Sequence, residues 1–88
     1  MTALQRIQKI EQEVAKRLEI PRERVRAIFY LNEDLQPIVI VEVFCENGYA
    51  AEAKITADED EQVISTIIRK LRSDYAEAIS ALQKVTTS

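Results

Sequence analysis

The pattern of apolar and polar positions is most distinctive at residues 37–45, where almost every side chain is apolar. The segment is too short to cross a membrane, and its β-branched valines and isoleucines disfavour a helix. Because consecutive side chains of a strand point to opposite faces, we expect a central strand that is covered on both sides. One face carries Val39, Val41, Val43 and Cys45, and the other carries Ile38, Ile40, Glu42 and Phe44. The first face is predicted to be core, and the second to meet a partner.

An amphipathic helix is predicted at the start of the chain. Thr2 and Gln5 have the spacing of a capping box. Pro21 ends the helix, because the residue before a proline is pushed out of helical geometry. The apolar stripe of this helix, with steps of three and four residues, consists of Leu4, Ile7, Ile10, Val14 and Leu18.

A second strand is predicted at residues 25–31, antiparallel to the central strand. The residues that follow it, 32–34, are typical of a turn. A loop with an odd number of residues brings the apolar face of this strand onto the apolar face of residues 37–45. An even number would set Val25 opposite Glu42, so burial favours the odd loop.

A third strand is predicted after the turn at residues 46–48, which reads Glu-Asn-Gly. A three-residue turn that ends in glycine suits a type I turn with a bulge. The resulting register sets Glu42 opposite Glu52, a repulsion that Arg26 and Lys54 can offset. The apolar face of the third strand is then Tyr49, Ala51, Ala53 and Ile55.

A long helix is predicted from about residue 57 to residue 85, after a capping box at residues 56–59. It would run about 42 Å, whereas strands of about seven residues reach only about 23–25 Å. The helix therefore overhangs the sheet, and a second copy of the chain is the expected cover for the excess. The dimer candidates on its heptad stripe are Tyr75, Leu82 and Val85.

These elements predict a single α+β domain over residues 1–88, with the order α-β-β-β-α and a short polar tail at residues 86–88. A three-stranded antiparallel meander has one face covered by the N-terminal helix and the long C-terminal helix. Small domains bury a modest share of their surface, and self-association is a common supplement. The chain is 47% apolar with one glycine and two prolines, which indicates regular structure rather than disorder.

The residue types argue against an enzyme, a metal site or a cofactor. Histidine is absent, which removes the commonest acid–base group and metal ligand. Cys45 is the only cysteine and is expected to be a buried, reduced thiol of a cytoplasmic protein. The acidic run at residues 58–61 suits the first turn of a helix and lacks the spacing of a calcium loop.

Charge is segregated along the chain. The net charge is −3, and Lys54 is the only basic residue of residues 31–66. Nucleic acid and an anionic membrane are therefore not expected to be the main partners. A basic group could receive an acidic segment, such as residues 58–61 of another copy. It comprises Lys16, Arg17, Arg22, Arg24 and Arg26.

The sequence thus predicts a protein–protein interaction module, such as an adaptor, assembly factor or small regulator, that acts as a homodimer. An apolar and aromatic patch with a charged border is the composition that interfaces favour. A small-molecule pocket between sheet and helices is a further alternative, without a convergent polar set to support it. The partner-binding residues are predicted to be Arg26, Ile28, Tyr30, Ile38, Ile40 and Phe44.

The layout also resembles the small nucleoid-associated proteins of the YbaB type in element order and chain size. These have a helix, a β-meander and a long closing helix. The resemblance implies a dimer that binds DNA, and it transfers no functional residue. The acidic balance of this chain weighs against that function.

Overall fold

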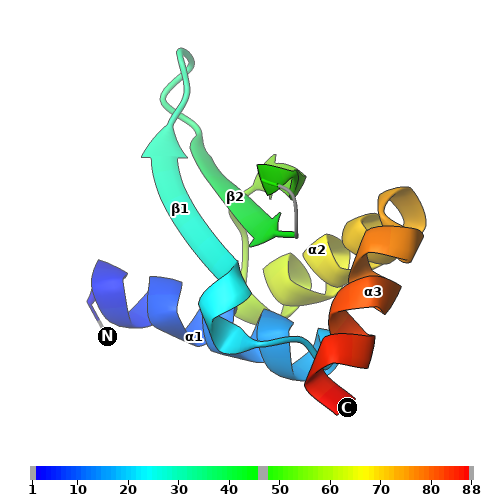
Figure 1. Cartoon of the computed structure of the whole chain (residues 1–88). Coiled ribbons are helices and arrows are strands. Elements are labelled where there is room, and N and C mark those ends of the chain that lie inside the picture. Colours follow the sequence, from blue (N-terminus) through cyan, green and yellow to red (C-terminus); the bar gives the residue numbers. More distant parts are fainter. Residues whose placement is uncertain (1, 46–47, 88) are drawn as a thin grey trace.

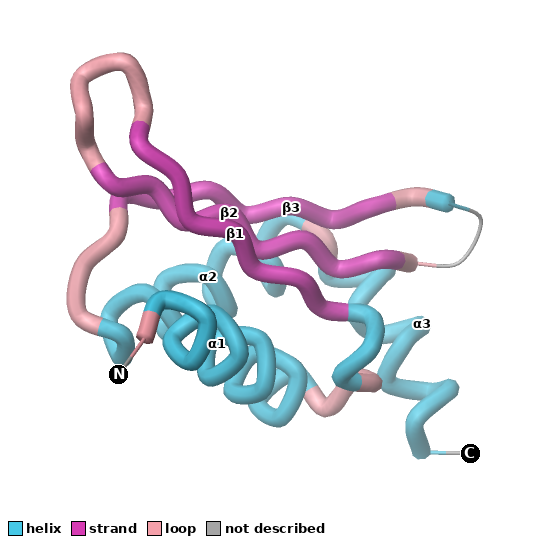
Figure 2. The backbone as a smooth tube through the Cα atoms, turned by 90° about the vertical axis from the view of Figure 1, so that its left-hand side faces the viewer, coloured by secondary structure: helices cyan, strands magenta, loops and turns pink. Residues whose placement is uncertain are grey.

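Three antiparallel strands, in the order β1 (Val25–Leu31), β2 (Pro37–Phe44) and β3 (Ala50–Thr56), form one sheet. The computed structural model describes residues 2–45 and 48–87, with side chains as far as residue 84. All three α-helices lie on the same side of the sheet (Figure 1, Figure 2). They are α1 (Ala3–Leu18), α2 (Asp60–Asp74) and α3 (Ala76–Thr87), and a short 3-10 turn, η1 (Arg22–Arg24), leads from α1 into β1. The predicted α+β meander is confirmed.

Helix α1 begins and ends as its sequence predicts. The Thr2 hydroxyl accepts a hydrogen bond from the Gln5 backbone N–H at 3.1 Å, and the Gln5 side chain accepts one from the Thr2 N–H at 2.8 Å. The helix ends at Glu19, which adopts a left-handed conformation with φ of 58° two residues before Pro21. Its buried stripe faces the sheet and α2, so the helix is held mainly by tertiary packing.

The strand registers are those that the burial pattern predicts. Val25 lies opposite Val43, and Glu42 lies opposite Glu52. The loop between β1 and β2 spans residues 32–36, an odd number. The Cys45 N–H donates to the Tyr49 carbonyl at 2.8 Å, which leaves three residues in the second turn, as predicted. Residues 46–47 of that turn lie outside the described residues, and Gly48 has a φ of 74°.

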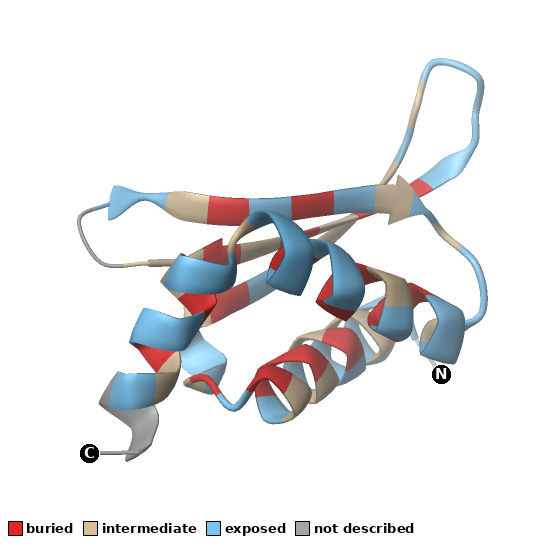
Figure 3. Cartoon of the chain, turned by 90° about the vertical axis from the view of Figure 1, so that its right-hand side faces the viewer, coloured by how far each residue is buried: buried red, intermediate tan, exposed pale blue. Residues whose placement is uncertain are grey.

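The core fills the space between the sheet and the helices (Figure 3). Ala51 and Ala53 of β3 are buried, and such small side chains allow α2 to approach the sheet closely. The largest fully buried side chains are Ile10, Leu18, Ile64, Ile67, Leu71, Val14, Val39, Val41, Val43 and Val63. Cys45 is half-buried and packs against the core at its edge, so its thiol is less buried than the sequence predicted.

The C-terminal segment is two helices rather than one long helix, which corrects the sequence prediction. The chain breaks at Tyr75, with φ of −134° and ψ of 35°, and α3 leaves α2 at an angle (Figure 1). After the break, Ile79 is 3% exposed and Leu82 is 2% exposed, both in the core of the same chain. In a straight helix these two side chains would extend past the sheet into solvent. The free energy gained by burying them offsets the cost of interrupting the helix.

The start of α2 also differs from the prediction. The predicted capping box at residues 56–59 does not form, because the helix begins at Asp60 with Glu59 as its N-cap. The Asp58 carboxylate instead accepts the Glu59 N–H at 2.8 Å. At the other end of the chain, α3 continues to Thr87, so two of the three residues predicted as a polar tail are helical. No helix in the described ranges is long and apolar enough to cross a membrane.

Candidate interaction surface

One side of the sheet carries none of the described helices, and we call it the open face. The register places side chains of alternate residues on it. The helices lie on the other side of the sheet (Figure 2, Figure 3). All six predicted partner-binding residues belong to it. The open face consists of Arg26, Ile28, Tyr30, Ile38, Ile40, Glu42, Phe44, Ala50, Glu52, Lys54 and Thr56.

The middle of the open face is apolar and aromatic. Ile28, Tyr30, Ile40 and Phe44 are each half-buried, although no helix covers them. Ile38 is only 6% exposed. Of the predicted set, Ile38 therefore offers the least surface to a partner.

The charged groups of the open face are poorly matched within the chain. Arg26 lies directly opposite Glu42 across β1 and β2, yet neither forms an ion pair with any described residue. Lys54 instead places its ammonium 5.6 Å from the centre of the Tyr30 ring, and Tyr30 raises the pKa of this ammonium. Cations favour the faces of aromatic rings in this way. Arg26 and Glu42 thus keep their charges available to a partner.

The hairpin between β1 and β2 bends away from the helices, toward the side of the open face (Figure 2). The Asn32 side-chain oxygen accepts the N–H groups of Asp34 and Gln36, each at 2.9 Å, and so fixes the loop. A hollow of about 460 Å³ forms where loop and sheet meet. We call it the acidic corner, and it is lined by Tyr30, Leu31, Asn32, Glu33, Asp34 and Lys54.

The opposite end of β1 is basic. Arg22 is held by Glu11, with 2.6 Å between nitrogen and oxygen, and Arg24 donates to the Phe44 carbonyl at 3.5 Å. Arg26 is exposed, and within the described part of the chain it makes no hydrogen bond or ion pair. The strand therefore runs from an arginine end to the acidic corner, which carries Glu33 and Asp34.

The acidic run at residues 58–61 binds α1 of the same chain, an arrangement that the sequence did not predict. Asp60 accepts from Arg6 at 2.6 Å, and Glu61 takes both terminal nitrogens of Arg17, at 2.8 and 2.9 Å. The hydrogen bond from Arg17 lowers the pKa of Glu61 below its ordinary value. Sequence spacing gives no signal for such contacts, because the partners are about fifty positions apart.

The three dimer candidates lie in different surroundings. Leu82 is buried in the core of its own chain, and the Gln83 side chain donates to the Leu18 carbonyl of α1 at 2.6 Å. Tyr75 is half-buried at the helix break, and the Val85 side chain lies outside the described part of the structure. The apolar stripe that was expected to overhang the sheet is thus covered by the chain itself as far as Leu82.

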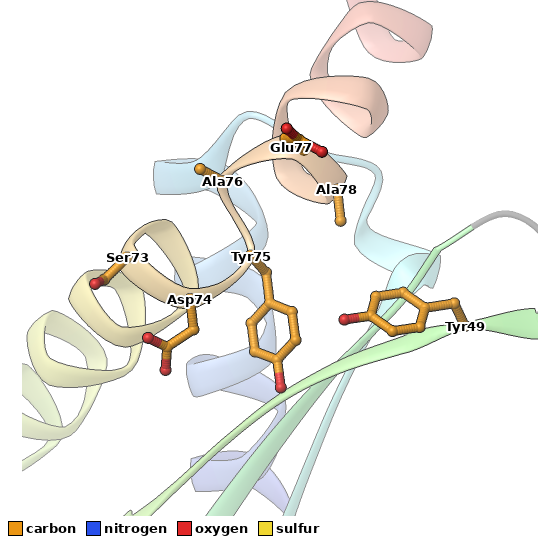
Figure 4. A pocket seen from close by; sticks show the side chains of 7 residues that line it. All are labelled: Tyr49, Ser73, Asp74, Tyr75, Ala76, Glu77 and Ala78. Carbon is orange, nitrogen blue, oxygen red and sulfur yellow. The ribbon is translucent and has the colours of Figure 1, made fainter.

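A second hollow, of about 450 Å³, lies beside the helix break. The rings of Tyr49 and Tyr75 are 6.1 Å apart and tilted by 56°. Figure 4 shows the carboxylates of Asp74 and Glu77 on different sides of Tyr75, directed away from the space between the rings. Because its polar groups diverge, the hollow lacks the convergent set that fixes a small ligand.

The described residues contain no group of three or more acidic or cysteine side chains that could hold a metal ion. Comparison of the chain with protein-family models, with curated proteins and with solved structures found no match. The chemistry of the open face is therefore the basis on which its function can be argued.

Proposed function

We propose that this chain is a non-enzymatic protein–protein interaction module that forms a homodimer through its open face. The observation that carries the proposal is the one-sided cover of the sheet. All the described helices pack on one side, so none of them covers Ile28, Ile40 or Phe44, which stay half-exposed on the other side. Removing this apolar surface from water favours association by about 25 cal/mol for each Å² buried.

The composition of the open face supports an interface rather than a catalytic site. It combines aliphatic and aromatic side chains with an arginine, which are enriched at the centres of protein interfaces. Its polar groups are spread over three strands and do not converge on one point. The open face is also continuous, because Ile28 lies directly opposite Ile40, and Tyr30 directly opposite Ile38.

Sedimentation equilibrium over a wide concentration range tests the proposal. We expect a species of twice the chain mass for the wild type and a monomer for Phe44→Glu, which places a charge in the apolar patch. Leu4→Glu is the matched control, because Leu4 is 62% exposed on α1, outside the open face. A wild-type chain that stays monomeric at every concentration would overturn the proposal, as would equal weakening by both variants.

A further inference from the structure

We infer that the two copies pack with their sheets face to face and their strands antiparallel, so that Arg26 of each copy enters the acidic corner of the other. The inference rests on the proposed function and specifies its geometry. It follows from two observations, namely the bend of the hairpin and the order of charges along the strands.

The bend of the hairpin restricts how two open faces can meet. Residues 32–36 rise from the sheet on the side that a second sheet would occupy (Figure 2). If the strands of the two copies ran parallel, both loops would stand at the same end and compete for the same space. In the antiparallel arrangement, each loop stands beyond the far end of the other sheet, so each copy holds the other between its sheet and its loop.

The charges favour the same arrangement. Strand β1 carries the unpaired Arg26 near its start and leads into Glu33 and Asp34 at its end. A two-fold axis that reverses the strand direction sets each arginine end against an acidic corner, twice in the dimer. A two-fold axis along the strands would instead lay β1 over β3 of the other copy, so that Arg26 meets Glu52 while the acidic corner faces the end of β3. A two-fold interface must be complementary to itself, and the antiparallel one satisfies this at both ends of β1.

The residue pairs across the strands show which side chains of the two copies would come together in this dimer. With the axis near Ile28, Arg26 comes to lie over Tyr30 of the other copy, at the mouth of the acidic corner. There the guanidinium can stack on the ring and pair with a carboxylate. Lys54 is level with Ile28 because both lie opposite Ile40, so this axis sets Lys54 over Lys54 of the other copy at the β3 edge. Glu42, on the central strand, comes to lie over Ile38 and gains no charged partner.

Charge reversal with mixing tests this geometry. Arg26→Glu makes both ends of β1 acidic, and the double variant Glu33→Lys with Asp34→Lys makes both ends basic. Each protein alone should dimerise at least roughly tenfold more weakly than the wild type, the change that about 1.4 kcal/mol produces. An equimolar mixture should form a heterodimer, because every acidic end then meets a basic one. Native mass spectrometry distinguishes the heterodimer from either homodimer by mass.

Matched neutralisations provide the control. Arg26→Gln and Glu42→Gln each remove one charge from residues that lie opposite each other. We expect the first to weaken the dimer and the second to leave it unchanged or tighter. Two results would overturn this orientation while the proposed function stands. One is that the charge-reversed variants dimerise as tightly as the wild type, and the other is that their mixture does not restore association. A wild-type monomer would instead refute the proposed function itself.

Discussion

Glu11 of α1 accepts a hydrogen bond from the backbone N–H of Ala27 in β1, with 2.8 Å between Oε2 and the nitrogen. The other carboxylate oxygen binds Arg22 at 2.6 Å, and Arg22 in turn donates to the Val25 carbonyl at 3.4 Å. Ala27 and Val25 belong to an edge strand, whose outward backbone groups have no neighbouring strand. A side chain from α1 thus satisfies part of an edge that would otherwise invite another strand.

Glu11→Ala should therefore lower the free energy of unfolding by about 1–3 kcal/mol, because it leaves a part-buried backbone N–H without an acceptor. Urea denaturation measures the loss. Glu13→Ala is the control, because among the described residues Glu13 pairs only with Arg17, at 3.4 Å near the surface, and such pairs contribute at most about 1 kcal/mol. Equal losses in both variants would contradict the role of Glu11 at the strand edge.

Leu82→Ala should lower the free energy of unfolding by about 2–5 kcal/mol, the usual cost of truncating a buried leucine. Because Leu82 is 2% exposed within a single chain, the loss should be the same at every protein concentration. Thermal unfolding over a hundredfold dilution checks this. A loss that grows on dilution would place Leu82 in the contact between copies, as the long-helix prediction supposed.

The stability of the fold should depend on pH through Glu61. Its carboxylate accepts a hydrogen bond from Arg17, which holds the folded-state pKa below the ordinary 4.5. The ionised form therefore stabilises the fold above pH 4.5, and the stabilisation is lost as the pH falls through the folded-state pKa. Glu61→Gln should melt below the wild type at neutral pH, and this difference should disappear in acid.

Glu59→Gln is the control for this pH dependence. Glu59 is exposed beside Glu61, and it forms no ion pair with the described residues. Its substitution should lower the melting temperature less than Glu61→Gln does, because it removes only the interaction with the helix N-terminus and no ion pair. A gap between wild type and Glu61→Gln that persists in acid would assign the effect to something other than the ion pair.

Binding to DNA should be weak and sensitive to salt. Several basic side chains are already matched inside the chain, since Arg6 binds Asp60, Arg17 binds Glu61 and Arg22 binds Glu11. With a net charge of −3, few cations remain to release counterions from DNA. A gel-shift titration should show retardation that is lost by about 0.2 M salt. Submicromolar binding at that salt would favour the nucleoid-associated alternative.

The sheet could be predicted from the sequence because its register follows from local choices. Apolar residues alternate along the strands, and a slip of one residue would bring Val25 to Glu42. The open face was predicted for the same reason, because Glu42 interrupts an otherwise apolar row. Both inferences need only the period of the strand and the lengths of two loops.

The helix break and the acidic corner could not be predicted in this way. The sequence around Tyr75 contains no glycine or proline, and the break is favoured by burial of Ile79 and Leu82 among residues distant in sequence. The bend that creates the acidic corner depends on Asn32 holding the loop and on Leu35 with φ of 60°. Both features are therefore determined by tertiary contacts, and these contacts cannot be inferred from the spacing of residues in the sequence.

The neighbour-to-neighbour order of the strands has a consequence for how the chain folds. Each strand pairs with the next one in sequence, so the meander closes only two short loops, at residues 32–36 and 46–48. Contacts between α1 and α2 are far less local, since Arg6 and Asp60 are 54 positions apart. Loop closure costs more entropy as the separation grows. We therefore expect the hairpins to form early and the docking of α1 on α2 to follow.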